Sequence, residues 1–405
     1  MLRFPGALAA ADFLHRYWQR RPLFIPGGLP LDLPVLDADE LAWLATLDDV
    51  ESRLMITERS GDACQYRMQH GPFSSEQLAA LPDADWTLLV QDVEKHLPDF
   101  RAWLDCVDFI PDWRVDDLMV SFAAPGGSAG PHRDNYDVFL CQSAGVREWQ
   151  IATAAARVRE VRMGELALLE PFVADRRHVA VPGDILYLPP GAPHWGIAQD
   201  ACLTYSIGMR APTQSEFSCA FERLYPGDPV RDAPSGGQRT APQFYQDPDL
   251  ASGESLPGQI SAETVLRARR SFPQFAAIDA EALIVTLGCV VTDLKAWLAP
   301  EQPDEAETEA ALRQISCDTT LPVHGMARLA WYAGEEGNMA FANGHSQALP
   351  GTELEFMQVL CRQRRLDPAA VALLACGESR NRLLSWLLTS GVLDLSDDAI
   401  QNHSD

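Results

Sequence analysis

The stretch GPHRDNYDVFLCQ, residues 130–142, places His132 and Asp134 two positions apart at the start of an apolar run. In an extended chain, residues i and i+2 lie on the same face, so both side chains would point the same way. That face would continue through Tyr136, Val138, Leu140 and Gln142. A His-x-Asp pair is common by chance. This pair could be two metal ligands, or it could be two polar residues at the solvent-exposed end of a strand.

A second stretch, VPGDILYLPPGAPHWGIA at 181–198, has a turn, a short apolar strand, a Pro/Gly turn and then His194, which leads into another strand. A strand that returns beside a much earlier one is typical of an antiparallel jelly roll. With His132 and Asp134, His194 would complete a two-histidine, one-carboxylate triad, which binds Fe(II) on one side and leaves the other side open. Surface or core roles are expected for the histidines that lack such framing, which are His15, His70, His96, His178, His324, His345 and His403.

Short apolar runs separated by Pro/Gly turns predict a series of strands in the first half of the chain. The predicted strands are 117–123, 136–142, 147–152, 166–170, 184–188 and 202–209. Ahead of them, apolar residues at helical spacing predict helices at 11–18, 37–47 and 74–82. The sequence therefore predicts an α+β protein whose first domain, residues 1–211, is a β-rich sandwich or barrel that begins with helices.

The second half of the chain is expected to hold two further domains. Residues 212–302 have helical patterns, and the apolar one at 281–299 must bury more than one face, which makes it a candidate for packing against a second copy. Residues 303–405 carry a helix, two short strands around an Asn-Gly turn and further helices, an order that predicts a winged-helix-like domain. Its lack of a basic recognition helix favours a structural or docking role. Within these regions, 226–259 is expected to be an extended connection and the acidic run 301–311 a linker.

Composition narrows the possible functions. The formal net charge of −25 disfavours general nucleic-acid binding, and it would attract a basic protein partner, although solubility alone can also explain it. Nine cysteines without a CxxC pair argue against a zinc ribbon or a disulfide framework and favour a reducing cytoplasm. No run approaches the roughly eighteen apolar residues of a membrane span, and the first residues do not predict a secretory signal.

An iron centre that activates oxygen needs a source of electrons, and 2-oxoglutarate is a usual one. Its far carboxylate requires a buried cation, and Arg147 in GVREWQI lies on the next predicted strand, thirteen residues beyond Asp134. A guanidinium suits bidentate binding of a carboxylate. Ser121 could add a hydroxyl, since Asp117, Met119 and Ser121 share a face of their strand. The alternative for Arg147 is a surface ion pair with Glu148 or another acid.

With these motifs in place, the sequence resembles the JmjC-type ribosomal oxygenases. The resemblance is strongest to the bacterial branch that hydroxylates the β-carbon of an arginine in a large-subunit ribosomal protein. It covers nearly the whole chain and weakens between 225 and 320. The segments that carry it are YWQRRPLFIPGG (17–28), ESRLM (51–55), HGPF (70–73), PDWRVDDLMVSFAAPGGSAGPHRDNYDVFLCQ (111–142), VPGDILYLPPGAPHWG (181–196), TYSIGMRAP (204–212) and FANG (341–344).

The resemblance implies a role for each candidate residue. It implies that His132, Asp134 and His194 bind Fe(II) as the catalytic centre, and that Arg147 anchors 2-oxoglutarate, with O2 as the second cosubstrate. The family's substrate-pocket positions fall on Asp117, Tyr136 and Ser206. The family fold is a jelly roll, a helical dimerisation domain and a winged helix, which implies a homodimer acting on a basic ribosomal protein.

Other functions fit the same residues. A different JmjC or cupin enzyme could hydroxylate histidine, demethylate lysine or use another divalent metal for isomerisation. A cupin-like binding module could hold a structural metal without catalysis. A winged-helix regulator is the most distant alternative, because direct DNA binding is not expected of so acidic a chain.

Overall fold

The computed structural model divides into two compact units, and each is described by itself. The structure describes residues 1–4, 6, 8–30, 32–60, 63–152, 159–227, 243–300, 302–315, 320–351, 353–374 and 377–393. The first unit comprises 1–109, 115–210 and 248–252, and the second comprises 110–114, 211–247 and 253–405. The predicted boundary between a helical domain and a winged-helix domain at 302/303 stays a prediction.

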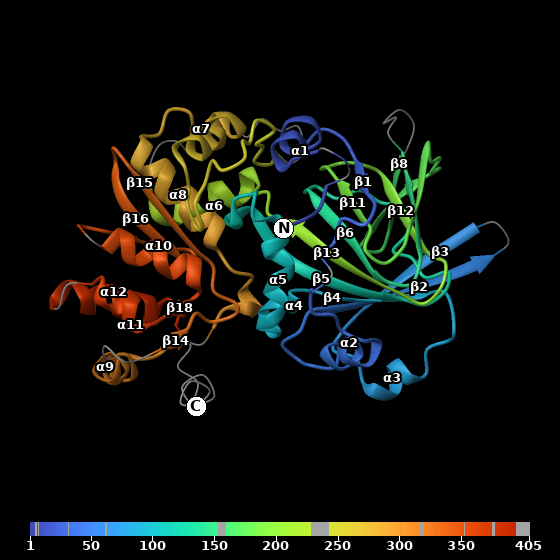
Figure 1. Ribbon diagram of the computed structural model, residues 1–405, viewed down its shortest axis with the longest axis horizontal. Coiled ribbons are helices and arrows are strands. Elements are labelled where there is room, and N and C mark those ends of the chain that lie inside the picture. Colours follow the sequence, from blue (N-terminus) through green and yellow to red (C-terminus); the bar gives the residue numbers. More distant parts are fainter. Residues whose placement is uncertain are drawn as a thin grey trace. The chain divides into compact units, whose positions relative to one another are not determined.

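The first unit is built mainly of antiparallel strands (Figure 1). Its large sheet has the order β1-β11-β6-β13-β5-β4-β2-β3, a smaller sheet has the order β10-β7-β12, and β8 and β9 form a separate hairpin. The strands are β1 Leu23–Ile25, β2 Ser52–Ser60, β3 Ala63–His70, β4 Trp86–Val90, β5 Val115–Ala123, β6 Val138–Ala144, β7 Arg147–Ile151, β8 Arg159–Met163, β9 Leu166–Glu170, β10 Arg176–Ala180, β11 Ile185–Leu188, β12 His194–Ala198 and β13 Cys202–Met209. This arrangement confirms the predicted jelly-roll sandwich.

Short helices precede and interrupt the large sheet, as the α+β prediction requires. They are α1 Ala10–Arg16, α2 Ala38–Leu44, α3 Ser75–Ala79, α4 Val93–His96 and α5 Arg101–Leu104. The sequence explains where α2 and α3 begin, because Asp37 and Ser74 each accept a hydrogen bond from the backbone N–H three residues later.

The predicted strand positions are largely right, and their differences from the structure are informative. The strand expected at 136–142 begins only at Val138. Just before it, the carboxylate of Asp137 accepts hydrogen bonds from the hydroxyl of Tyr187 and from Nε2 of Gln19.

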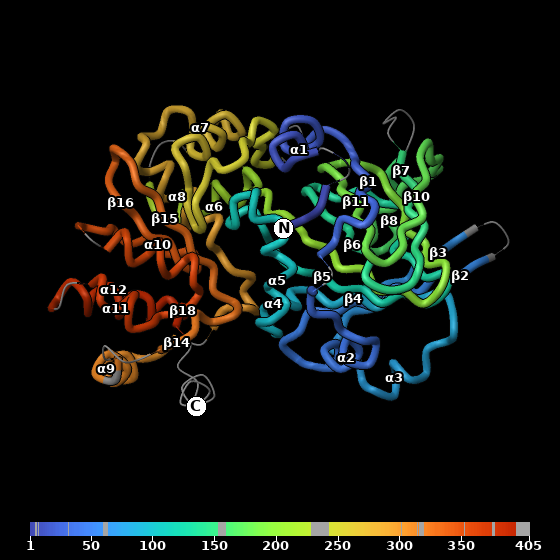
Figure 2. Tube along the Cα trace, viewed as in Figure 1, coloured from blue at the N-terminus to red at the C-terminus, as the bar shows by residue number. Residues whose placement is uncertain are grey.

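Six strands of this unit were not predicted, and they are β1, β2, β3, β4, β8 and β10. The outer halves of β2 and β3 project as a hairpin beyond β4 (Figure 2). The exposed Glu58, Arg59 and Gln65 lie in this part and mask the apolar alternation.

The second unit combines helices with a small antiparallel sheet. Its helices are α6 Gln214–Leu224, α7 Ala262–Ser271, α8 Ala280–Thr292, α9 Glu305–Gln314, α10 Glu353–Gln363, α11 Pro368–Ala372 and α12 Glu378–Thr389. Its strands are β14 Leu321–Pro322, β15 Leu329–Gly334, β16 Gly337–Ala342, β17 His345–Ala348 and β18 Arg365–Leu366. The predicted Asn-Gly turn, Asn343–Gly344, joins β16 to β17 with both residues at positive φ, and β15 adds a third strand.

Two predictions for this unit are wrong. The helix expected at 281–299 ends at Thr292, because Asp293 adopts an extended backbone. The run 301–311 is not a linker throughout, because Asp304 caps α9 and exchanges hydrogen bonds of 2.8 Å with Glu307. Of the connection expected at 226–259, residues 228–242 lie outside the described part of the chain, as does His403.

Helix α8 is the most apolar helix of the unit, and its burial explains that composition. Every side chain from Ala282 to Thr292 is buried, and a Cβ at Gly288 would lie 2.2 Å from the ring of Phe341 on β16. The unit itself therefore covers this helix, so its apolar sequence alone does not require a second copy. Among the described helices, none is long and apolar enough to cross a membrane.

Candidate functional site

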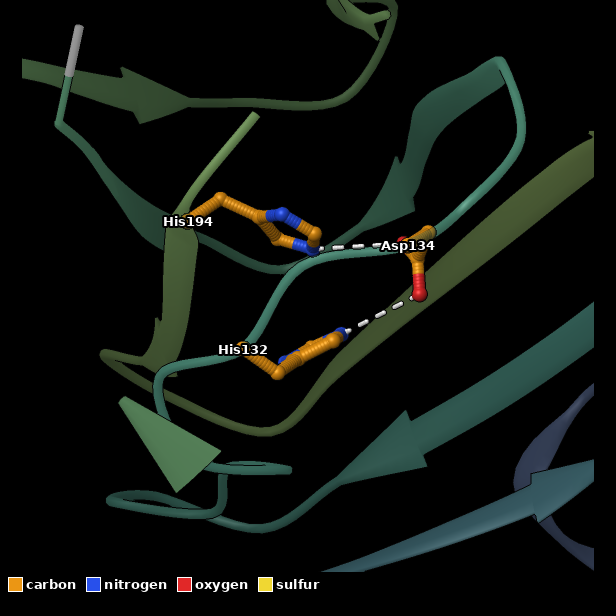
Figure 3. A group of neighbouring side chains, drawn as sticks. All are labelled: His132, Asp134 and His194. Carbon is orange, nitrogen blue, oxygen red and sulfur yellow. Dashed lines mark ion pairs between the residues drawn. The ribbon is translucent and has the colours of Figure 1, made fainter. Parts of the chain in front are cut away.

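His132, Asp134 and His194 converge in the first unit (Figure 3). One carboxylate oxygen of Asp134 lies 3.7 Å from Nε2 of His132, and the other lies 3.6 Å from Nε2 of His194. Each residue offers one ligand atom, and these atoms all lie within 4.8 Å of one another. Metal–ligand distances of about 2.0–2.2 Å to histidine nitrogen and carboxylate oxygen are compatible with that spacing.

Backbone pairing brings the two histidines together from distant parts of the sequence. His132 and His194 form an isolated antiparallel bridge, in which each backbone N–H donates to the other's carbonyl at 2.9 Å. Asp134 lies beyond the bridge and before β6, and its carbonyl accepts a hydrogen bond from the N–H of Gly191 at 2.7 Å. The expectation that the His-x-Asp pair lies on a regular strand is therefore wrong in detail, although the pair still faces one point.

Both imidazoles are held in the orientation that a metal requires. Nδ1 of His132 donates to the carbonyl of Gly130 at 2.9 Å, and Nδ1 of His194 donates to that of Ala192 at 3.0 Å. Carbonyl oxygens only accept, so each Nδ1 carries the proton and each Nε2 keeps its lone pair toward Asp134. Burial, reinforced by neighbouring His132, lowers the pKa of His194 to about 4, so this imidazole is neutral at physiological pH.

Arg147, at the start of β7, is a buried cation with weak partners. Its side chain is 4% exposed, and Nη1 reaches the hydroxyls of Ser121 and Thr204 only at 3.5 and 3.4 Å. Nε has no partner, and no carboxylate of the described residues forms an ion pair with Arg147. The guanidinium lies 4.9 Å from the ring centroid of Trp149, and burial lowers its pKa.

The surface alternative for Arg147 is wrong. Glu148 points to the other side of the strand, where it accepts hydrogen bonds from Gln150 at 2.8 Å and Arg177 at 3.3 Å. An unpaired buried guanidinium is costly for a protein to maintain. A site that keeps one is suited to an anionic ligand, and the predicted role of Arg147 fits this environment.

A cavity of about 310 Å³ lies between the two sheets and contains the triad and Arg147. The predicted substrate residues Asp117, Tyr136 and Ser206 also line this cavity, as does Ser121. The hydroxyl of Ser206 is buried and has no hydrogen-bond partner among the described residues, while Tyr136 is 41% exposed. The negative charge of Asp134, followed by burial, raises the pKa of Tyr136, so its hydroxyl stays protonated.

Asp117 is a buried acid that lacks a cation. It is 5% exposed, and its Oδ2 accepts a hydrogen bond from Nε2 of Gln91. Burial is the main cause that raises the pKa of its carboxyl group to about 8, followed by the charges of Asp116, Asp92 and Glu94. No arginine, lysine or histidine of the described residues forms an ion pair with Asp117.

Thr204, Arg53 and Gln91 also line the cavity, and none of them was predicted from the sequence. Thr204 is paired with Ser121 in the β5–β13 register and contributes a second hydroxyl beside Arg147. Arg53 on β2 donates to Oε1 of Gln91 at 2.6 Å, and Gln91 in turn donates to Asp117. ESRLM contains Arg53, but nothing in that segment alone shows that it reaches a site built on β5.

Comparisons with known proteins agree with this site. A JmjC domain model matches residues 103–217. The chain is 38% identical over 239 residues to the ribosomal protein uL16 3-hydroxylase of Escherichia coli, covering 59% of this chain and 60% of that one. It is also 38% identical over 268 residues to a probable ribosomal oxygenase of Haemophilus influenzae, covering 64% and 59%. These alignments span about three fifths of each curated relative's own length.

Solved structures extend the similarity to almost the full length. The crystal structure of the Escherichia coli ribosomal oxygenase YcfD superposes with a TM-score of 0.67 at 30% identity, covering 97% of this chain and 99% of that one. The same relative in complex with cobalt and 2-oxoglutarate gives a TM-score of 0.66 at 29% identity, with the same coverage. On this whole-length match, the chain belongs to the JmjC-domain ribosomal oxygenase family.

Proposed function

We propose that this protein is an Fe(II)- and 2-oxoglutarate-dependent oxygenase that hydroxylates the β-carbon of an arginine in the large-subunit ribosomal protein uL16. The uL16 3-hydroxylase activity of the Escherichia coli relative supports the target protein, and the complex of YcfD with cobalt and 2-oxoglutarate supports the cofactors. The observation that carries the proposal is the placement of a buried, unpaired Arg147 and a His-Asp-His cluster in one cavity.

His132, Asp134 and His194 would hold Fe(II) through two neutral imidazoles and one carboxylate. Arg147 would bind the far carboxylate of 2-oxoglutarate, assisted by the hydroxyls of Ser121 and Thr204. When bound, the metal and 2-oxoglutarate activate O2, so that one oxygen atom enters the substrate C–H bond and the other leaves in succinate, with release of CO2. The chain's own contribution is to orient these groups and hold the substrate carbon close to them.

The strand register separates the two ends of the cavity. Ser121 pairs with Thr204 beside Arg147, while Asp117 pairs with Gly208 four residues away along β5. At about 3.3 Å per residue, the two positions are about 13 Å apart. The cosubstrate would therefore occupy the Arg147 end, and the substrate side chain would enter the Asp117 end.

The Asp117 end suits an arginine side chain. A buried carboxylate without a cation is a favourable partner for a guanidinium, which can form two parallel hydrogen bonds with it. Tyr136 would lie along the aliphatic part of the side chain, and the unpaired hydroxyl of Ser206 would accept or donate a further hydrogen bond.

The acidic chain would attract its basic substrate over long distances, since the net charge is −25. The resemblance further supports a homodimer formed by the helical domain at 212–302, a winged-helix domain at 303–405 without direct DNA binding, and action in the cytoplasm, where ribosomal proteins are made. Sedimentation velocity of the full chain would test the homodimer.

A direct assay tests the proposed activity. Purified protein is incubated with Fe(II), 2-oxoglutarate and recombinant uL16, and peptide mass spectrometry then locates any added oxygen atom. We expect a single oxygen on one arginine, with one succinate formed per oxygen added, and no reaction by His132→Ala. A gain on histidine, loss of a methyl group from lysine, or metal binding without succinate formation would instead identify the alternative functions.

A further inference from the structure

A basic and an acidic side chain line the substrate end of the cavity without touching each other. Arg53 extends from β2 and Asp117 from β5, and both line the cavity. Arg53 contacts Gln91 and, at 3.9 Å, the sulfur of Met119, but it forms no ion pair with any described acid. Asp117 likewise has no cationic partner among the described residues.

Gln91 stands between Arg53 and Asp117. Its Oε1 accepts a hydrogen bond from Nη2 of Arg53 at 2.6 Å, and its Nε2 donates to Oδ2 of Asp117. An amide has distinct donor and acceptor ends, so the cation on one side and the acid on the other fix its orientation. Its backbone N–H donates to the carbonyl of Glu51 at 2.9 Å, which anchors the residue just after β4.

Without this spacer, the guanidinium of Arg53 would attract the ionised carboxylate of Asp117. Arginine forms bidentate pairs with carboxylates, and attraction is stronger in a partly desolvated cavity than in water. Such a pair would occupy the carboxylate oxygens that a substrate guanidinium needs. In the observed arrangement Gln91 uses only Oδ2, while Oδ1 faces Gly208, where a Cβ would lie 2.7 Å away.

We propose that Gln91 is a specificity-determining residue that keeps Arg53 off Asp117 and so reserves this carboxylate for the guanidinium of the substrate. Without Gln91, Arg53 would compete with the substrate guanidinium for the carboxylate of Asp117. Gln91 prevents this competition by holding Arg53 away. This inference rests on the proposed function for the identity of the substrate side chain, but the spacing of Arg53 and Asp117 does not depend on it.

Three variants separate this role from simple packing. In Gln91→Ala, the spacer is gone and Arg53 can reach Asp117, so we expect KM for uL16 to rise about ten-fold or more, with a much smaller change in kcat. In Gln91→Ala combined with Arg53→Met, the competitor is absent, so KM should fall back toward the value of Arg53→Met alone. The affinity for 2-oxoglutarate should be unchanged in all three, because Arg147 lies at the other end of the cavity. Gln150→Ala, on the face of β7 opposite Arg147, is the matched control and should alter neither constant.

Two results would overturn the proposal. One is an unchanged KM in Gln91→Ala, and the other is a double variant that is no better than Gln91→Ala, because loss of a purely structural glutamine is not rescued by removal of the neighbouring Arg53 charge. A crystal structure of Gln91→Ala gives a readout that needs no substrate. We expect a nitrogen of Arg53 within hydrogen-bonding distance of Asp117, and an unmoved Arg53 would also refute the proposal. If the wild-type protein never modifies arginine, the proposed function fails, and the crystal structure still decides whether Gln91 is a spacer.

Discussion

Replacing Arg147 by methionine should remove 2-oxoglutarate binding without weakening the fold. The free protein gains little from this guanidinium, because its two hydroxyl contacts are long and its Nε is unpaired. Methionine fills much of the volume of the aliphatic stem. The guanidinium charge would therefore favour binding of 2-oxoglutarate, while it destabilises the unliganded protein.

The magnitudes follow from these contacts. Hydrogen bonds between charged groups are worth about 1.5–3 kcal/mol each, so two lost bonds should weaken 2-oxoglutarate binding by about 3 kcal/mol or more, which is over about 100-fold in Kd. For the fold, the lost cation–π contact with Trp149 costs about 1–2 kcal/mol. Removal of the unpaired buried charge stabilises the fold by several kcal/mol. The free energy of unfolding should therefore be unchanged or higher.

Both quantities can be measured on the same preparation. Calorimetric titration of 2-oxoglutarate into anaerobic, Mn(II)-loaded protein gives Kd, and thermal unfolding without 2-oxoglutarate gives Tm. Arg177→Met is the control, since this exposed arginine pairs with Glu148 on the other side of β7 and should change neither value. A Kd of Arg147→Met within about three-fold of wild type, or a Tm lowered by several degrees, would refute the reasoning.

Four further outcomes are expected. His132→Ala and Asp134→Ala should each abolish Mn(II) binding in a metal titration while the circular dichroism spectrum stays that of the wild type. Because the carboxyl pKa of Asp117 is raised to about 8 and a cation binds only the ionised form, kcat/KM for uL16 should fall as pH drops below about 8, and Asp117→Asn should flatten that profile. Raising ionic strength from about 0.05 to 0.5 M should raise KM for uL16 much more than it lowers kcat, because the attraction by the net charge of −25 is screened. Gly196→Ala should lower the free energy of unfolding by about 1–3 kcal/mol in a denaturant titration, because its Cβ would lie 2.4 Å from the ring of Trp149.

The sequence predicted those parts of the fold that local patterns encode. The central strands of the jelly roll are short apolar runs between Pro/Gly turns. The two stretches that carry His132 and His194 follow this pattern of turn and apolar run clearly. The structure brings these residues together through a backbone bridge, which the sequence could suggest only by the jelly-roll pattern. The Asn343–Gly344 turn was predictable for the same reason, since few dipeptides adopt two positive φ angles.

The sequence could not predict features that depend on partners far along the chain. Strand β2 was missed because part of it projects beyond β4, and Arg53 was missed with it. Helix α9 was taken for a linker because its surface is acidic, although the Asp304–Glu307 capping box was present in the sequence. The sequence could not show that Arg147 lacks an acid partner, because this depends on tertiary structure. In the fold, Glu148 accepts a hydrogen bond from Arg177.

The register of one strand pair would let a single cavity hold the proposed cosubstrate and substrate at two fixed positions. Side chains alternate along β5, so Asp117 and Ser121 face the cavity together, and β13 places Gly208 and Thr204 opposite them. A shift of the strand pairing by one residue would turn all of these side chains to the other face of the sheet. Such a shift would therefore disrupt both ends of the cavity together. Point substitutions, in contrast, act on one end at a time. A change of target residue should therefore require new side chains around Asp117 only, with the Arg147 end and the triad left as they are.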